Sequence, residues 1–188
     1  MKTKLMTAAI VAALGLSGMS HALTKAEHDS ELNRLSADFK TAKRNCDTLS
    51  GNARDICMAE ANGAHKVGRA ELEARHMGTL QARYDAQVAK AEANYDVAKE
   101  RCDDFAGNAK DVCLKDAKAA LIRAKAGAKV DRETRQANRQ SLQKVADARR
   151  DADNDVRKAE YAAAVERCDS FAGNAKDRCI ADAKARFG

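Results

Sequence analysis

The sequence has no proline and no tryptophan, and only 4% of its 188 residues are aromatic. Without proline, no helix is broken by a ring that fixes φ and removes a backbone donor. So few aromatic side chains do not form the stacking platform of a single-strand nucleic-acid binder, so nucleic acid is not an expected partner. Alanine and charged residues dominate instead, a composition typical of long helices rather than of a thick globular core.

Long hydrophobic runs are absent except at the start of the chain. Lys2 and Lys4 precede an apolar run over 5–19, and a small-residue sequence ends at Ala22. A membrane-spanning helix needs about 20 apolar residues, and this run is shorter. The pattern predicts a signal peptide over 1–22 with cleavage after Ala22, export to the periplasm, and no transmembrane segment once the signal is removed.

Charge of one sign is not concentrated anywhere along the chain. The net charge is +6, but 34 basic and 28 acidic residues are interspersed along its length. This distribution is typical of solvated helix surfaces rather than of a basic patch that binds a polyanion.

Cysteine occurs in three copies of one pattern. The copies are CDTLSGNARDIC at 46–57, CDDFAGNAKDVC at 102–113 and CDSFAGNAKDRC at 168–179. Glycine suits the left-handed position just past a helix end, and the following asparagine suits the N-cap of the next helix. These turn and cap positions are Gly51, Asn52, Gly107, Asn108, Gly173 and Asn174.

Reversal of the chain at each glycine-asparagine pair brings its two cysteines to the same level of an antiparallel helix pair. In one uninterrupted helix, cysteines eleven residues apart lie about 16 Å from each other, and only bonds between chains could then form. With an exported chain and an even number of cysteines, we expect three local disulfides. The expected pairs are Cys46–Cys57, Cys102–Cys113 and Cys168–Cys179.

Each cysteine pair follows an apolar stripe with alternating spacings of four and three. The second copy places Tyr84, Val88, Ala91 and Tyr95 on this stripe, whereas the outer half of the third copy is polar, so its hairpin should be short. The expected fold is all-α, an elongated coiled-coil-like array of three antiparallel helical hairpins. The boundaries are 23–78, 79–126 and 137–188, with a polar connector over 127–136 that is a soft joint or an exposed helix.

Smaller signals mark the helix boundaries. Thr24 and Glu27 form a capping box, which places the first helix start near residue 25. Gly63 and Gly68 are expected to weaken the second helix. The sequence leaves open whether Gly78 and Gly127 break their helices or only bend them.

Motifs for catalysis or for a metal or other cofactor are not recognisable. The cysteines lack the two-to-four-residue spacing of zinc sites, and no Cys-x-x-Cys motif is present. We therefore expect no enzyme activity and no cofactor. In the turns, only the basic residue lacks a structural reason, so a contact with an anionic surface is possible for Arg54, Lys110 and Lys176.

The cysteine repeat between Ala/Lys/Glu-rich helices, after a predicted signal sequence, resembles a group of exported Gram-negative proteins labelled TolA-like or cell-envelope biogenesis proteins. The resemblance implies a periplasmic compartment, and we do not extend it to the Tol-Pal role. The leading hypothesis is a non-catalytic structural or protein-interaction module of the cell envelope, with envelope proteins as partners. The alternatives are a holdase-type chaperone or stress protein, and a salt-sensitive binder of an anionic polymer or lipopolysaccharide.

Overall fold

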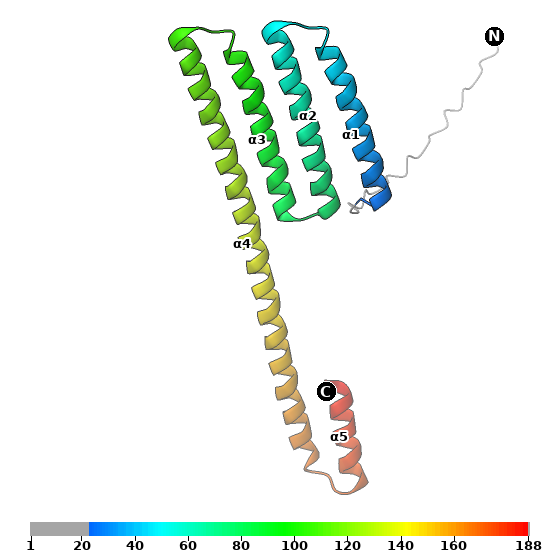
Figure 1. Cartoon of the computed structure of the whole chain (residues 1–188). Coiled ribbons are helices and arrows are strands. Elements are labelled where there is room, and N and C mark those ends of the chain that lie inside the picture. The colour runs from blue at the N-terminus through cyan, green and yellow to red at the C-terminus, as the bar shows by residue number, and fades with distance from the viewer. Residues whose placement is uncertain (1–22, 188) are drawn as a thin grey trace, which may run out of the picture.

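The computed structural model describes residues 23–187, so the predicted signal peptide lies outside the described residues. This part of the chain is helical and contains no strand. Its helices are α1 (Lys25–Cys46), α2 (Gly51–Met77), α3 (Leu80–Cys102), α4 (Gly107–Cys168) and α5 (Asn174–Phe187) (Figure 1). No helix within 23–187 has the length and hydropathy of a membrane span.

The first four helices lie side by side in a single row (Figure 1). Each helix of the described chain packs against its neighbours in sequence and against no other helix. Helix α4 runs far beyond the row, and α5 folds back along its distant end (Figure 1). A row buries less surface per residue than a bundle does, so close helix contacts and covalent links contribute a large share of its stability.

Local signals explain the helix boundaries. The predicted capping box is present: the Glu27 amide donates to Thr24 Oγ1 at 3.3 Å, and the Thr24 amide donates to Glu27 Oε2 at 2.9 Å. This backbone donor lowers the pKa of Glu27. Gly78 has a φ of 64° and ends α2, whereas Gly127 lies within α4 and does not interrupt it.

The structure reverses one expectation about glycine. Gly63 and Gly68 were predicted to weaken α2, but they are the places where neighbouring helices approach closely. A Cβ atom added at Gly63 would lie 2.9 Å from Ala93 Cβ on α3, and one at Gly68 would lie 2.8 Å from a Leu35 methyl on α1. The absent side chains therefore allow close packing on both sides of α2, and this packing offsets the lower helix propensity of glycine.

Helix α3 is apolar on two sides, which places it inside the row. Tyr84 and Tyr95 belong to the stripe identified in the sequence, and cations of α4 lie over both rings, Arg132 at 4.4 Å and Lys118 at 5.4 Å. A second stripe, with the same spacings of four and three, is buried and includes the Ala93 that meets Gly63 of α2; it consists of Ala82, Ala86, Ala89 and Ala93. This second stripe joins the first two cysteine units into one row.

One carboxylate links three helices of the row. Glu92 on α3 lies 2.5 Å from Lys66 Nζ on α2 and 2.6 Å from Lys125 Nζ on α4. Hydrogen bonds from Lys125 and then Lys66 hold the pKa of Glu92 below its usual value. The ionised carboxylate therefore favours the arrangement in which α2 and α4 flank α3.

Between the row and α5, α4 is a solvated helix. Residues 133–160 are exposed, apart from a half-buried Asp147. The predicted polar connector, 127–136, is part of α4 at the end of the row. It is helical throughout. Helix α5 has only 14 residues, in keeping with the polar outer half of its cysteine unit.

Candidate functional site

The three cystine turns are the repeated feature of the molecule and the first candidate site. Disulfides join Cys46 to Cys57, Cys102 to Cys113 and Cys168 to Cys179, with Cα–Cα distances of 5.5, 5.6 and 5.7 Å. No cysteine within the described residues is a free thiol. The cystines link the end of one helix to the start of the next and so brace the helix ends.

The backbone of the turns differs from the sequence prediction in one respect. Gly51, Gly107 and Gly173 have φ values of 57°, 55° and 54°, the left-handed conformation expected for glycine. However, the chain makes one further tight turn after the first cysteine, so each glycine begins the next helix or directly precedes it. The extended residue before the helix is Ser50 for α2 and Ala106 for α4.

The asparagines are consequently not N-caps. Asn52 and Asn108 are second in their helices, Asn174 is first in α5, and no side chain caps α2 or α4. The prediction failed because it placed the glycine at the end of the first helix, one turn too early. In the first turn the asparagine side chain contacts the second turn instead of capping a helix: Asn52 Nδ2 donates to Asp104 Oδ1 at 2.6 Å.

Each turn contains an ion pair that the sequence pattern does not indicate. The basic residue pairs with the aspartate that follows the first cysteine: Arg54 with Asp47 at 2.9 Å, Lys110 with Asp103 at 2.8 Å, and Lys176 with Asp169 at 2.8 Å. The pairing raises the pKa of Arg54 and of Lys176, chiefly through the hydrogen bond to the aspartate. The ion pair therefore supplies the structural reason that the basic residue lacked.

The tip of each turn presents one large apolar side chain. Leu49, Phe105 and Phe171 occupy equivalent positions and are 43%, 52% and 53% exposed. Their amides donate to the carbonyls of Cys46, Cys102 and Cys168, in a tight turn that leads the chain away from the preceding helix. Such exposure is compatible with a contact surface, and on its own it is a common feature of soluble proteins.

The turns are divided between the two ends of the molecule. The first two lie together at one end of the row, where the Asn52–Asp104 hydrogen bond connects them (Figure 1). Arg101 and Glu60 add a contact of 2.7 Å between α3 and α2 close by. The third turn lies at the opposite end of α4 (Figure 1). Any partner of the turns therefore meets one double tip and one distant single tip.

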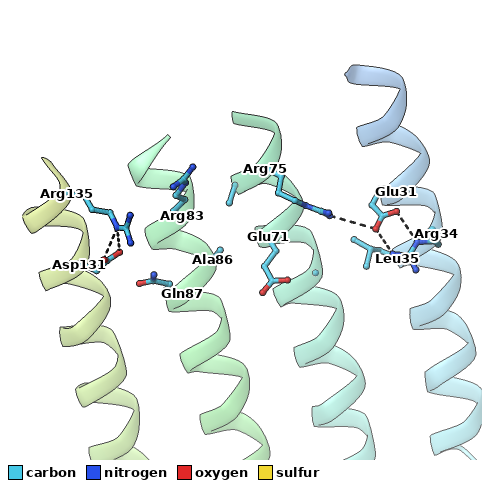
Figure 2. Close-up of a pocket in the computed structure, with 12 residues that line it drawn as sticks. Glu31, Arg34, Leu35, Glu71, Arg75, Arg83, Ala86, Gln87, Asp131 and Arg135 are labelled. Carbon is cyan, nitrogen blue, oxygen red and sulfur yellow. Dashed lines mark hydrogen bonds and ion pairs between the residues drawn. The ribbon is translucent and has the colours of Figure 1, made fainter. Parts of the chain in front are cut away.

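A groove of about 630 Å³ crosses one face of the row and is the second candidate site. Figure 2 shows that α1, α2, α3 and α4 all contribute side chains to it. Small residues such as Gly68 and Ala86 also line it. Its charged side chains are Glu31 and Arg34 on α1, Glu71 and Arg75 on α2, Arg83 on α3, and Asp131 and Arg135 on α4.

Most of the charge in this groove is neutralised within it. Glu31 pairs with Arg34 at 2.5 Å and lies 3.9 Å from Arg75, and Arg34 is the main cause of the lowered pKa of Glu31. Arg135 Nε donates to both Asp131 oxygens at 2.9 Å. Arg83 has no ion pair among the described residues. With three of its four guanidinium groups paired, the groove has the character of a polar helix surface rather than of an anion site.

A third candidate is a more apolar groove of about 710 Å³ between α2 and α3, on the side of Cys113. It is lined by small and branched side chains such as Gly63, Ala93, Val67 and Val97. Its lining also includes charged side chains, two of which, Glu60 and Arg101, pair with each other at 2.7 Å. A groove of this kind can receive an apolar side chain of another molecule.

The histidines, which are scattered in the sequence, are partly brought together by the fold. The rings of His28 and His76 are 4.6 Å apart, and His28 Nε2 lies 3.0 Å from Glu73 Oε1. His65 stacks on Phe39 at 4.5 Å. Within residues 23–187, no cluster of three histidine, cysteine or acidic side chains is arranged to hold a metal ion.

Comparisons with known proteins do not assign a role to these features. No protein-family model, no curated protein and no solved structure matches the chain.

Proposed function

We propose that this chain is a non-catalytic, exported structural module, an extended spacer that holds two cystine-braced ends apart for partner proteins of the cell envelope. The observation that carries the proposal is the bare section of α4 between the row and α5. The 28 residues of this section, 133–160, all exposed except Asp147, extend about 42 Å at 1.5 Å per residue. Such a helix contributes no core, and its length separates the double tip from the single tip.

The covalent braces support the same function. A helical hairpin at the end of a lone helix has little buried surface, and a disulfide that closes a loop of about twelve residues adds roughly 3 kcal/mol in the chain-entropy model. Oxidation to cystine fits an exported chain, since thiols are kept reduced in the cytoplasm. The expected compartment is the periplasm, in line with the sequence resemblance.

We do not propose the basic residues of the turns as a contact surface. Arg54, Lys110 and Lys176 each have an aspartate partner within their own turn. Binding of a polyanion through these residues would have to displace that partner. Steep loss of binding with salt is the result that would favour a polyanion ligand.

A holdase-type chaperone is the second candidate. Its support is the half-exposed apolar side chain at each tip, together with the apolar groove between α2 and α3. This function predicts that the oxidised protein suppresses aggregation of an unfolded model client at near-stoichiometric ratios. Lack of suppression would remove the candidate.

The spacer is tested by shortening α4 without rotating its ends. Deletion of 136–153 removes 18 residues, which is about five full helical turns and about 27 Å. The matched control replaces the same residues with an equally long Ala/Glu/Lys helix. Partners are captured from envelope extract by the full chain, by both variants and by the reduced full chain.

Under the spacer proposal, the control recovers the same complex as the full chain, and the shortened variant loses the joint recovery of proteins bound at the two ends. Reduction should release partners that need the braced tips. If the shortened variant recovers every partner as efficiently as the full chain, the length of α4 has no role and the proposal is wrong.

A further inference from the structure

The bare section of α4 carries an apolar stripe that no part of the described chain covers. Residues 142, 145, 149, 152 and 156 alternate in spacing by three and four, the period of a coiled-coil seam. Leu142, Val145 and Val156 are 71%, 47% and 56% exposed, although they are the large apolar residues of this section. The stripe therefore has the spacing of a helix-packing face but lacks a packing partner within the chain.

Two short stretches of this section carry charge of opposite sign, although acidic and basic residues are mixed in the rest of it. The stretch 135–144 contains three basic residues and no acidic one, and the stretch 151–155 contains three aspartates and no basic residue. Arg139 and Asp153, one from each stretch, form no ion pair with any described residue. A helix that complements this surface must place acidic residues beside the stretch 135–144 and basic residues beside the stretch 151–155.

A second copy of the chain, running antiparallel, meets this requirement. From this complementarity we infer that the protein self-associates through residues 138–156 of α4, with two copies related by a two-fold axis near residue 147. In that register, Leu142 packs against Ala152 of the second copy and Val145 against the stem of Arg149 of the second copy. Arg139 then flanks Asp153 of the second copy, and the symmetry forms this pair twice.

The parallel arrangement is disfavoured by the same residues. It would place Arg149 against Arg149 of the second copy at the centre of the seam. It would also set Asp155 beside Glu160 of the second copy, where like charges repel. The orientation is thus selected by charge, while the apolar stripe supplies the contact.

The fold leaves room for the second copy. At 3.6 residues per turn, the stripe is rotated by roughly a third of a turn from Tyr161, Ala164 and Cys168, the less exposed residues on the side of α4 that packs against α5. A helix docked on the stripe therefore need not displace α5. Because the seam is short and contains alanine and arginine, the association should be weak and concentration-dependent.

The test is sedimentation equilibrium of the oxidised full chain at increasing concentration, with charge-reversal variants. Arg139→Glu and Asp153→Lys should each weaken dimerisation by at least several-fold, since each places like charges across the seam. The double variant restores the opposite pairing and should recover most of the lost affinity. Far-UV circular dichroism checks that helix content is unchanged.

The apolar part of the seam is tested with a matched pair. Leu142→Ser should weaken the dimer, whereas Val130→Ser, an exposed site on the same helix at 62% exposure but outside the stripe, should not. Spin labels at positions 140 and 154, which face away from the stripe, leave Arg139 and Asp153 in place. Labels at 140 of both copies should lie farther apart than a label at 140 of one copy and a label at 154 of the other. The opposite result would indicate the parallel arrangement and overturn the inference.

A chain that remains monomeric to millimolar concentration overturns the inference. So does a dimer that tolerates both single charge reversals, because it would then form through another surface. If the chain is monomeric but Leu142→Ser loses a captured partner protein, the stripe serves a different protein and not a second copy. These substitutions leave the length of α4 unchanged, so the spacer proposal is tested separately.

Discussion

Substitution of Gly63 by alanine tests the packing of the row most directly. Helix propensity alone predicts a gain of about 1 kcal/mol for glycine to alanine within a helix. The new Cβ atom would lie 2.9 Å from Ala93 Cβ and 3.5 Å from Ala93 Cα, atoms that cannot move without the α3 backbone. Overpacking of this kind costs about 1–3 kcal/mol, so the net change should run from roughly zero to a loss of about 2 kcal/mol.

Gly127→Ala is the matched control, because Gly127 also lies inside a helix and a Cβ atom there meets nothing within 4 Å. This variant should gain about 1 kcal/mol, and the difference between the two variants then isolates the overpacking cost. Gly68→Ala should fall between them, since the atom it meets is a mobile methyl of Leu35.

The assay is urea denaturation of the oxidised proteins, followed by circular dichroism, with the slope of the transition checked for constancy. If Gly63→Ala stabilises the chain as much as Gly127→Ala does, α2 and α3 do not approach each other as described. The row of four helices would then be wrong, and the first two cysteine units would be separate hairpins.

Three further perturbations test individual features. Glu92 has a lowered pKa in the folded chain, so it contributes stability above its ordinary pKa of 4.5 that is lost as pH falls through the folded value. Glu92→Gln should therefore reduce, by up to about 1 kcal/mol, the fall in the free energy of unfolding between about pH 5 and pH 3. An unchanged pH profile would contradict the link between three helices. Replacement of Cys168 and Cys179 by serine should lower the stability of the α5 hairpin alone by roughly 3 kcal/mol. Hydrogen-exchange protection should then be lost in α5 and kept in the row, whereas loss of protection in both would show that the two ends are coupled. Gly107→Ala should cost about 1–2 kcal/mol, because alanine is strained at the φ of 55°, and a higher melting temperature would argue against the left-handed turn.

Each proposed function is excluded by a different experimental result. The spacer depends on the length of α4 and is tested by the phase-preserving deletion. Self-association depends on Arg139, Asp153 and Leu142 and is tested by point substitutions. A chaperone function is tested with an unfolded client and predicts no dependence on either.

Several features follow from the sequence by local rules. Helix content follows from composition, the capping box from Thr24 and Glu27, and the left-handed glycines from the requirement for a tight reversal. The cysteine pairing follows from the same reversal, since residues so near the turn have few other partners. Local spacing and backbone sterics decide all of these features, and both can be read from the chain itself.

Other features required the positions of residues far apart in the chain. Gly63 resembles a weak point until Ala93 is placed opposite it, and Lys110 has no evident role until the extra turn brings Asp103 within reach. The alanine stripe of α3 was not distinguishable from ordinary helix composition, because alanine is favoured in helices whether buried or exposed. The sequence alone therefore determined the helices and their covalent braces, while only the tertiary structure decided that two units merge into a row and that α4 continues alone, because these outcomes depend on packing between distant residues.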